Sequence, residues 1–401
     1  MKYAVILGDG MADYPVESLG GRTPLEVANK PFIDSLIKVS ETGLVKTVPE
    51  GLKPGSDVAN LSVLGYNPFN CYTGRSPLEA ASIGIELKDT DVTARANLVT
   101  LSDEENYEDK TMIDYSAGEI TTAEARELIA FLGERLNDGK YRLYSGVSYR
   151  HCLVIDNGAI CGNLTPPHDI TGKPVKDHLP KGENSEKYYE LMRKSYELLS
   201  AHPVNLKRVK DGKRPANSLW FWGEGTKPKL ENFKEKFGVS GAMISAVDLL
   251  KGIGKLAGMR VIEVAGATGN YDTNFIGKAQ ACLNALKTVD FAYIHMEAPD
   301  ECGHHGDVEH KIYSIERIDE VTRTVVEGLK KSGEDFKVMI LPDHPTPVKV
   351  MTHVSDPVPY IIYDSRKRID GGAERYTEKA AAKTGVYVPQ GWDLMKKLIE
   401  K

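Results

Sequence analysis

The run Ala4-Val5-Ile6-Leu7-Gly8-Asp9-Gly10 near the start of the chain sets its architecture. An apolar run that ends in glycine and an acid is typical of a buried parallel strand followed by a turn at the sheet edge. Similar runs occur at residues 260–264, 291–295 and 337–341, each closed by a glycine or followed by an acid. Amphipathic helical stretches separate them, so we expect an α/β fold with an open, mostly parallel sheet.

Helix starts are marked by two related tetrapeptides, Thr23-Pro24-Leu25-Glu26 and Ser76-Pro77-Leu78-Glu79. Each combines a hydroxyl side chain for the N-cap, proline at the first helical position and glutamate three residues after the cap. Farther on, apolar residues from Val308 to Leu329 recur at helical spacing up to Ser332-Gly333. That pattern predicts a long helix, which we expect to act as scaffold.

The middle of the chain lacks the alternating strand and helix pattern of the two ends. Residues 87–215 contain one clear helix at 122–136, a short strand at 152–155 and a loop rich in proline and glycine at 165–174. We expect these residues to form a second α/β domain. It would be inserted into a core domain made of residues 1–86 and 216–401. The basic run 206–214 is broken by Asp and Gly, so we interpret it as a solvated connection at the boundary.

Composition limits the possible functions. The 401 residues carry 51 Lys and Arg against 57 Asp and Glu, a formal charge of -6, so no overall basic field is available for nucleic acid or a membrane surface. The apolar runs are far shorter than the ~20 residues of a membrane span. No secretory signal follows Met1-Lys2, and five scattered cysteines suggest reduced thiols, so we expect a cytoplasmic protein.

Histidines gather toward the C-terminal end, where six of the ten lie between residues 295 and 353. Several stand with carboxylates just after the predicted strands. The carboxyl ends of parallel strands face a common crevice, so these side chains are expected to converge. Oxygen and nitrogen ligands together suit Mn²⁺, Zn²⁺ or Co²⁺ better than Mg²⁺ alone, and two ions can share such a set. The candidate ligands are Asp9, Asp300, His304, Asp343, His344 and His353.

Each of these residues also has a plainer interpretation. Asp9 between two glycines fits a turn former, and His304 alone fits a surface or core histidine. Asp343-His344 is harder to dismiss, because Pro345 and Pro347 stiffen the loop that follows the strand. The combination, rather than any one residue, predicts a metal site.

Ser56 follows the Pro54-Gly55 turn at the start of a short predicted helix. A serine there is commonly an N-cap, and the amides of a helix N-terminus also bind anions. A neighbouring divalent metal would favour a third role, because it stabilises the alkoxide of a serine nucleophile.

In this order, the chemistry-bearing motifs resemble those of the alkaline phosphatase superfamily: Gly8-Asp9-Gly10, Gly55-Ser56-Asp57, Asp300-Glu301-Cys302-Gly303-His304, Asp343-His344 and His353. Over essentially its full length, the chain more closely resembles the archaeal-type 2,3-bisphosphoglycerate-independent phosphoglycerate mutases, which also occur in bacteria. The segments that carry this likeness are Gly74-Arg75-Ser76-Pro77-Leu78-Glu79-Ala80-Ala81, Gly146-Val147-Ser148-Tyr149-Arg150-His151, Pro167-His168-Asp169-Ile170-Thr171-Gly172, Ala216-Asn217-Ser218-Leu219-Trp220 and Thr352-His353-Val354-Ser355-Asp356-Pro357-Val358-Pro359.

The resemblance implies an isomerase of glycolysis and gluconeogenesis that interconverts 3-phosphoglycerate and 2-phosphoglycerate through a phosphoserine at Ser56. It implies two divalent ions, with Mn, Zn or Co favoured and Mg possible, and no 2,3-bisphosphoglycerate. One ion would be bound by Asp300, His304 and His353, and the other by Asp9, Asp343 and His344, with Ser56 reaching a metal.

A small phosphorylated acid needs cations and hydrogen-bond donors, and water must be excluded while the phosphoryl group is on the enzyme. We therefore expect the inserted domain to bind substrate and act as a lid. The candidate contacts are Arg75, Arg95, Arg150, His151, His168, Asp169 and Lys278.

The alternative function is that of a metal-dependent phosphomonoesterase or a phosphosugar mutase of the same superfamily. A metal-binding protein without catalysis would have no need of Ser56. The sequence does not determine the oligomeric state.

Overall fold

The computed structural model describes residues 1–400 and divides into two compact units. Unit 1 combines Met1–Tyr72 with the chain from Lys229 onward, and unit 2 is Thr73–Pro228. Unit 2 therefore begins before, and ends after, the predicted insertion at 87–215. The reason is packing, because α5 (Ser76–Ser82) and β7 (Ser218–Thr226) both lie against β3 (Val92–Leu101) of unit 2.

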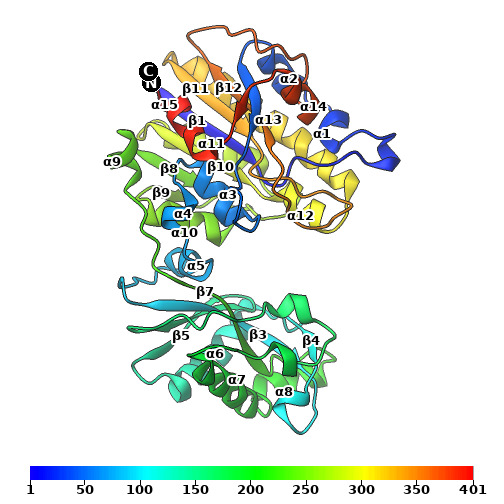
Figure 1. The fold of residues 1–401 in the computed structure, drawn as a ribbon, viewed down its shortest axis with the longest axis vertical. Coiled ribbons are helices and arrows are strands. Elements are labelled where there is room, and N and C mark those ends of the chain that lie inside the picture. Colours follow the sequence, from blue (N-terminus) through cyan, green and yellow to red (C-terminus); the bar gives the residue numbers. More distant parts are fainter. Residues whose placement is uncertain (401) are drawn as a thin grey trace. The chain divides into compact units, whose positions relative to one another are not determined.

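Unit 1 is built on a sheet with the strand order β13-β2-β12-β11-β1-β10-β8-β9. At its centre β1 (Lys2–Gly8) runs parallel to β10 (Phe291–Met296) and β11 (Phe336–Leu341). Only β12 (Val358–Asp364) runs against its neighbours on both sides. The prediction of a mostly parallel sheet is confirmed (Figure 1). The outer strands are β2 (Glu41–Val45), β8 (Gly241–Ile244), β9 (Arg260–Ile262) and β13 (Tyr387–Val388).

Successive residues of β1 point to opposite faces of the sheet of unit 1, and helices pack against both faces. Ala4 and Ile6 share a buried cluster with residues of α2, α11 and α13, whereas the Tyr3 hydroxyl donates to the Ile399 carbonyl of α15. The helices of this unit are α1 (Pro24–Val27), α2 (Pro31–Ile37), α3 (Ser56–Val63), α4 (Pro68–Cys71), α9 (Phe233–Phe237), α10 (Asp248–Leu256), α11 (Phe275–Ala285), α12 (Ala298–His304), α13 (Val308–Ser332), α14 (Glu378–Lys383) and α15 (Leu394–Ile399).

The helix signals read from the sequence had different outcomes. Thr23 forms the expected capping box with Glu26, and α13 ends at Ser332 with Gly333 as its C-cap, in the left-handed conformation with φ 73°. The predicted cap at Ser76 is wrong. Arg75 occupies the N-cap position without a side-chain cap bond, and Glu79 forms an ion pair with Arg75 instead of bonding the backbone.

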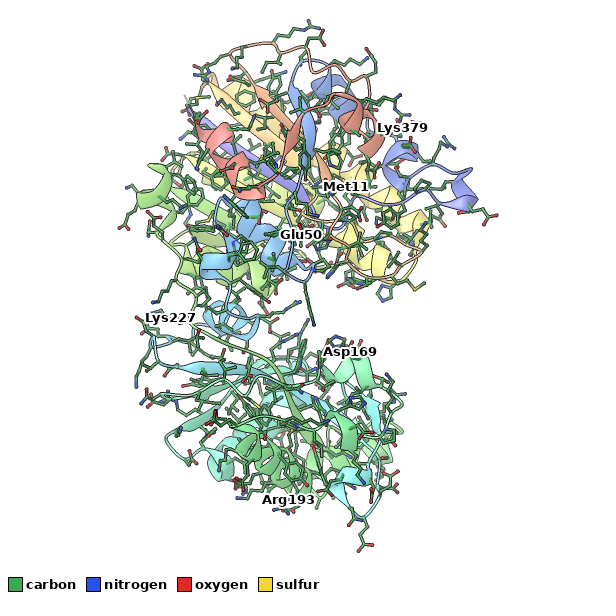
Figure 2. All side chains as sticks on the ribbon, viewed as in Figure 1. Met11, Glu50, Asp169, Arg193, Lys227 and Lys379 are labelled. Carbon is green, nitrogen blue, oxygen red and sulfur yellow. The ribbon has the colours of Figure 1, made fainter. Side chains whose placement is uncertain are left out.

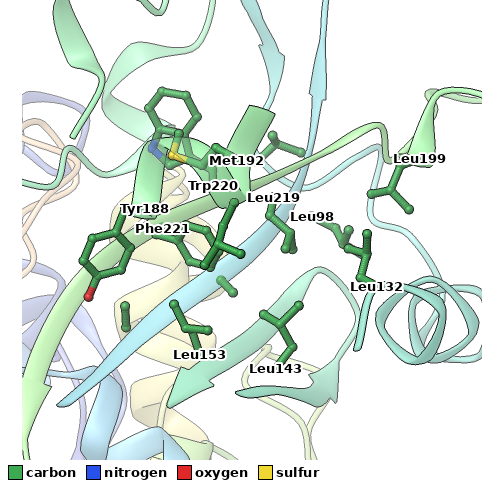
Figure 3. Close-up of a cluster of buried hydrophobic side chains, with 14 of the residues drawn as sticks. Leu98, Leu132, Leu143, Leu153, Tyr188, Met192, Leu199, Leu219, Trp220 and Phe221 are labelled. Carbon is green, nitrogen blue, oxygen red and sulfur yellow. The ribbon is translucent and has the colours of Figure 1, made fainter. Parts of the chain in front are cut away.

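Unit 2 has an antiparallel sheet in which β3 pairs with β6 (Arg150–Ile155), β7 and β4 (Met112–Asp114), and β5 (Tyr141–Val147) pairs with β6. Its remaining helices are α6 (Thr122–Leu136), α7 (Ser185–Leu199) and α8 (Pro203–Lys210). Figure 3 shows the core between sheet and helices, where Leu98, Trp220 and Phe221 meet Leu132 and Tyr188.

The basic run 206–214 is solvated as predicted, with every residue except Arg208 exposed, but it lies within unit 2 and not at its boundary. Arg208 of α8 is buried, with Nη1 2.8 Å from Glu124 Oε2, and Arg214 contacts Asp114. Other charged side chains of the unit, such as Asp169 and Arg193, are exposed (Figure 2). Among residues 1–400, no helix is both long enough and apolar enough to cross a bilayer.

Candidate active site

The first cluster of candidate ligands lies at the end of α12. One helical turn separates Asp300 from His304, so both side chains lie on one face. His304 Nε2 is 3.2 Å from Asp300 Oδ2, and His353 Nε2 is 3.5 Å from Asp300 Oδ1. The two imidazole Nε2 atoms are only 2.9 Å apart. Two ring nitrogens and a carboxylate therefore face a common point, as the ligands of a divalent cation do.

The orientation of His304 is fixed by its other nitrogen. Nδ1 donates a hydrogen bond to the Met351 carbonyl at 3.1 Å, which turns Nε2 toward Asp300 and His353. Met351 has φ 58°, in the left-handed region that a side-chain-bearing residue rarely adopts. Such strain is typical of functional sites, and here it accompanies the bond that orients the histidine.

A second cluster lies deeper, where Asp9, Asp300 and His344 bring ligand atoms within 4.8 Å of one another. Asp343 adjoins them, with Oδ2 3.4 Å from His344 Nε2. Asp9 Oδ1 is buried and has no hydrogen-bond partner among the described residues, which fits a position that a cation would occupy. The set implied by the resemblance is thus brought together, with Asp300 beside it.

Ser56 is the first residue of α3, and Gly55 rather than Ser56 occupies the N-cap position. Its Oγ lies 3.2 Å from His344 Nε2, and the residue is 8% exposed. Asn60, one turn later, donates from Nδ2 to the Ser56 carbonyl and to Asp343 Oδ2, both at 2.8 Å. Ser56 is therefore directed at the cluster instead of capping the helix. Asn60 was missed from the sequence, although its spacing of four from Ser56 places both on one helix face.

The electrostatics of the clusters favour the binding of cations. Burial raises the pKa of Asp9 well above its usual value, and Asp343 and Asp300 raise it further. For Asp300, burial is outweighed by hydrogen bonds from His304 and His353, so its pKa lies well below the usual value. Burial lowers the pKa of His344, which keeps this ring neutral. Divalent cations would compensate the buried carboxylates.

His295, at the end of β10, extends the site and was not assigned from the sequence. Its Nε2 donates to Asp9 Oδ2 at 2.7 Å, and its Nδ1 lies 3.2 Å from Ser245 Oγ. Parallel pairing could have suggested this contact, because His295 lies beside Leu7, two residues before Asp9.

Lys278, a predicted substrate contact, lies in the interior of unit 1 and not among exposed cations. It is 0% exposed, and Nζ donates to the His295 carbonyl at 3.1 Å. Burial lowers its pKa to about 8, against the opposing influence of Glu297. Lys278 therefore contacts the end of β10 at His295, and its role as a substrate contact stays a prediction.

Unit 2 contains a cationic cluster around Glu79. Arg75 Nε is 2.9 Å and Arg95 Nε 2.8 Å from the two oxygens of Glu79. Burial would raise the pKa of Glu79, but Arg95, Arg75 and Arg150 together hold it below the usual value. Three guanidinium groups around one carboxylate leave an excess of positive charge, which suits an anion.

Aromatic rings support this cluster. The Arg95 guanidinium lies 3.9 Å from the centre of the Trp222 ring, and the His168 ring meets Trp222 edge-on at 5.1 Å. Asp169, with Oδ1 3.6 Å from His168 Nε2, is exposed. His151 is placed differently: it is 4% exposed, Nδ1 accepts from the Gly146 amide, and burial lowers its pKa to about 3. The structure therefore does not group His151 with the exposed cations.

Known proteins resemble this chain along its whole length. It is 50% identical over 402 residues to a 2,3-bisphosphoglycerate-independent phosphoglycerate mutase of Methanothrix thermoacetophila, with 100% of both chains covered. A probable enzyme of the same name from Geobacter sulfurreducens is 48% identical, again covering both chains completely. The chain belongs to the 2,3-bisphosphoglycerate-independent phosphoglycerate mutase family. A family profile of that description matches residues 38–205.

Solved structures agree with this family and fold. A Pyrococcus horikoshii protein superposes with a TM-score of 0.82 at 30% identity, covering 100% of this chain and 96% of that one. The cofactor-independent phosphoglycerate mutase of Thermoplasma acidophilum gives 0.65 at 26% identity, covering 100% and 99%. The family and fold class predicted from the sequence are confirmed.

Proposed function

We propose that this chain interconverts 3-phosphoglycerate and 2-phosphoglycerate through a phosphoserine at Ser56, independently of 2,3-bisphosphoglycerate. The observation that carries the proposal is the position of Ser56 Oγ, 3.2 Å from His344 Nε2 and next to two clusters of metal-ligand type. The names of the relatives support the same isomerase activity. As expected from the sequence, the substrate is a small phosphorylated acid, and we assign the reaction to the cytoplasm.

Two divalent cations fit the residues of unit 1. We assign one to Asp300, His304 and His353 and the other to Asp9, Asp343 and His344, with Ser56 in reach of a metal. The mixture of carboxylate and imidazole suits Mn, Zn or Co, and Mg remains compatible with the carboxylates. When bound, such cations withdraw charge from phosphoryl oxygens and favour the serine alkoxide.

The protein's own residues account for the covalent steps. Ser56 Oγ loses its proton and attacks phosphorus, a bond from Oγ to phosphorus forms, and the bond from phosphorus to the glycerate oxygen breaks as that oxygen takes up a proton. The other glycerate hydroxyl then loses its proton and attacks the phosphoserine, and Ser56 Oγ is released and protonated again. Asn60 holds the Ser56 carbonyl and Asp343 during both steps, so the nucleophile keeps its position relative to the cluster.

Recognition of the substrate's negative groups is assigned to unit 2. Arg75, Arg95 and Arg150 exceed the charge of Glu79, and the exposed loop with His168 and Asp169 offers hydrogen bonds to hydroxyl groups. Hydrolysis of the phosphoserine would turn the enzyme into a phosphatase, so the unit must also help exclude water.

The test supplies 3-phosphoglycerate to metal-loaded protein without 2,3-bisphosphoglycerate and follows the reaction by phosphorus NMR. We expect 2-phosphoglycerate as the product. Ser56→Ala should lower turnover by at least about 10⁴-fold, because it removes the nucleophile. Metal content should stay close to that of the parent protein.

A matched control lies in the same helix. Ser62 of α3 is fully buried, and its Oγ has no hydrogen-bond partner among the described residues. Ser62→Ala should therefore leave turnover within about twofold of the parent. Full activity of Ser56→Ala would eliminate the phosphoserine. Inorganic phosphate as the only product would indicate the alternative, a phosphomonoesterase.

A further inference from the structure

Lys311 belongs to α13, a helix that carries none of the proposed metal ligands. Its side chain is nevertheless 0% exposed, and its ammonium group reaches two of the segments that carry them. Nζ lies 2.7 Å from Asp13 Oδ2, 2.7 Å from the Thr346 carbonyl and 3.4 Å from the Ala12 carbonyl. An ammonium group has three donors, so these three acceptors use all of them.

The two segments that meet at Lys311 are also joined to each other. One follows Asp9 and the other follows Asp343-His344. The Thr346 amide donates to the Ala12 carbonyl at 3.3 Å, and isolated bridges pair Met11 and Ala12 with Pro345. Asp13 accepts from the Val348 amide at 3.2 and 3.3 Å. Lys311 and Asp13 thus form a buried ionic link across both segments.

Thr346 connects this link to the ligands themselves. Its hydroxyl donates to Asp300 Oδ1 and lies 3.3 Å from His344 Nδ1. The packing around Thr346 is tight. If Gly10 carried a β-carbon, that atom would lie 2.6 Å from Asp300 Oδ1, and a β-carbon at Gly303 would overlap the Thr346 carbonyl. A shift of Thr346 must therefore move Asp300 or His344.

We propose that Lys311 is a positioning residue of the metal centre, acting through Asp13 and Thr346 to hold the segments that carry Asp9, Asp300 and His344. The inference rests on the proposed function, because it takes these residues as ligands. A buried ion pair contributes little net stability compared with well-packed apolar side chains. What the pair supplies here is a fixed separation between two loops of the metal centre.

The experiment replaces the lysine by an apolar side chain of similar length. Lys311→Met should weaken binding of Mn²⁺ or Co²⁺ to the full-length protein by about 10–100-fold, as removal of a group that orients metal ligands does. A second variant, Asp13→Asn with Lys311→Met, leaves no uncompensated charge. It should recover the thermal stability lost in the single variant and still bind metal weakly.

Lys30 provides the control. It is also buried in unit 1, with Nζ 3.3 Å from Asp34 Oδ1 one turn along α2. Lys30→Met also disrupts an ion pair, here between a buried lysine and a partly buried aspartate, so it should cost stability but leave metal affinity within about twofold. Equal losses of affinity in Lys30→Met and Lys311→Met would overturn the inference, because the effect would then be general destabilisation.

The metal-free protein gives an independent measurement. Amide hydrogen exchange in residues 343–354 should be faster in Lys311→Met than in the parent, whereas Lys30→Met should leave these amides unchanged. Parent-like exchange and parent-like affinity in Lys311→Met would overturn the positioning role alone. A parent protein that binds no divalent metal would instead overturn the proposed function, so the two failures are distinguishable.

Discussion

The two units gather charge in opposite ways. Unit 1 brings buried carboxylates and imidazoles together where parallel strands end, and Asp9, Asp343 and His344 are all 0% exposed. Unit 2 surrounds a single glutamate with arginines from the start of α5 and from two strands of the antiparallel sheet, and Arg75 and Arg150 remain partly or fully exposed. A buried set of acids requires cations to be stable, whereas arginines that are partly exposed are available to an anion.

This difference assigns metal binding and chemistry to unit 1 and substrate binding to unit 2. The groups of unit 1 are fixed by backbone and by neighbouring side chains, as His304 is by Met351 and Asp9 by His295. The arginines of unit 2 are held by Glu79 and by aromatic rings such as Trp222. Changes in unit 1 should therefore alter metal affinity and chemistry, and changes in unit 2 should alter substrate affinity.

Among the substitutions that compare the two units, the largest effect is expected from Asp300→Asn. Asp300 is a proposed ligand of one metal and also lies within ligand distance of Asp9 and His344, so loss of its charge should release the first metal and weaken binding of the second. We expect kcat to fall by more than about 10³-fold, because metal-assisted charge stabilisation contributes several kcal/mol. Metal content by elemental analysis and steady-state kinetics measure the two effects.

Asp319→Asn is the control for that substitution. Asp319 is 3% exposed in α13, and it accepts hydrogen bonds from the Phe32 and Ile33 amides, away from the ligands. This variant should lose thermal stability but keep its metals. If Asp300→Asn retained both metals and its activity, the separation of tasks between the units would be wrong.

A pH-dependent effect of intermediate size follows from His304. Burial opposes protonation, but Asp300 raises the pKa of this ring from 6.5 to about 9 in the metal-free protein. A cation must displace that proton, so its apparent affinity should rise about tenfold per pH unit up to about pH 9 and then level off. Calorimetric titration at several pH values measures the slope, and His304→Gln should flatten it.

The same shift has a consequence for the stability of the metal-free protein. Because the folded-state pKa is raised, the stabilisation by protonated His304 is complete below about 6.5, the ordinary value. It is lost as the pH rises through about 9. The melting temperature of metal-free protein should fall over this range by more than that of His304→Gln. Equal slopes for the two proteins would contradict the shift.

The sequence predicted unit 1 better than unit 2 for a physical reason. Strand ends in a parallel sheet converge whatever lies between them, so Asp9, Asp300 and Asp343 could be grouped from their positions alone. The groups that orient them could not, since Thr346 and Lys311 act through contacts across segments. In unit 2, Glu79 was predicted as part of a capping box, but two arginines compete for its carboxylate.

Burial was equally hard to predict. His151 and Lys278 carry the chemistry of substrate contacts, yet one is 4% and the other 0% exposed. Periodicity indicates which face of a strand or helix is apolar, but a polar side chain can be buried on that face when it finds a partner. Here the partners are the Gly146 amide and the His295 carbonyl, which are brought close only by the fold.

The smallest effect is expected from Glu79→Gln, which keeps the shape of the side chain and removes its charge. Without the carboxylate, Arg75 and Arg95 lose the ion pairs that fix their guanidinium groups. We expect KM for 3-phosphoglycerate to rise about tenfold, equivalent to about 1.4 kcal/mol of binding. Metal affinity should stay within about twofold, as measured by calorimetry on the same preparation.

Glu124→Gln is the control that distinguishes the role of Glu79 in substrate binding from the loss of any ion pair in unit 2. Glu124 also lies in unit 2 and pairs with a buried arginine, Arg208, at 2.8 Å, but neither residue belongs to the cluster around Glu79. Its substitution should lower thermal stability without changing KM. A larger KM in both variants would show that unit 2 merely loses stability. A lower metal affinity in Glu79→Gln would mean that the two charge clusters do not act separately.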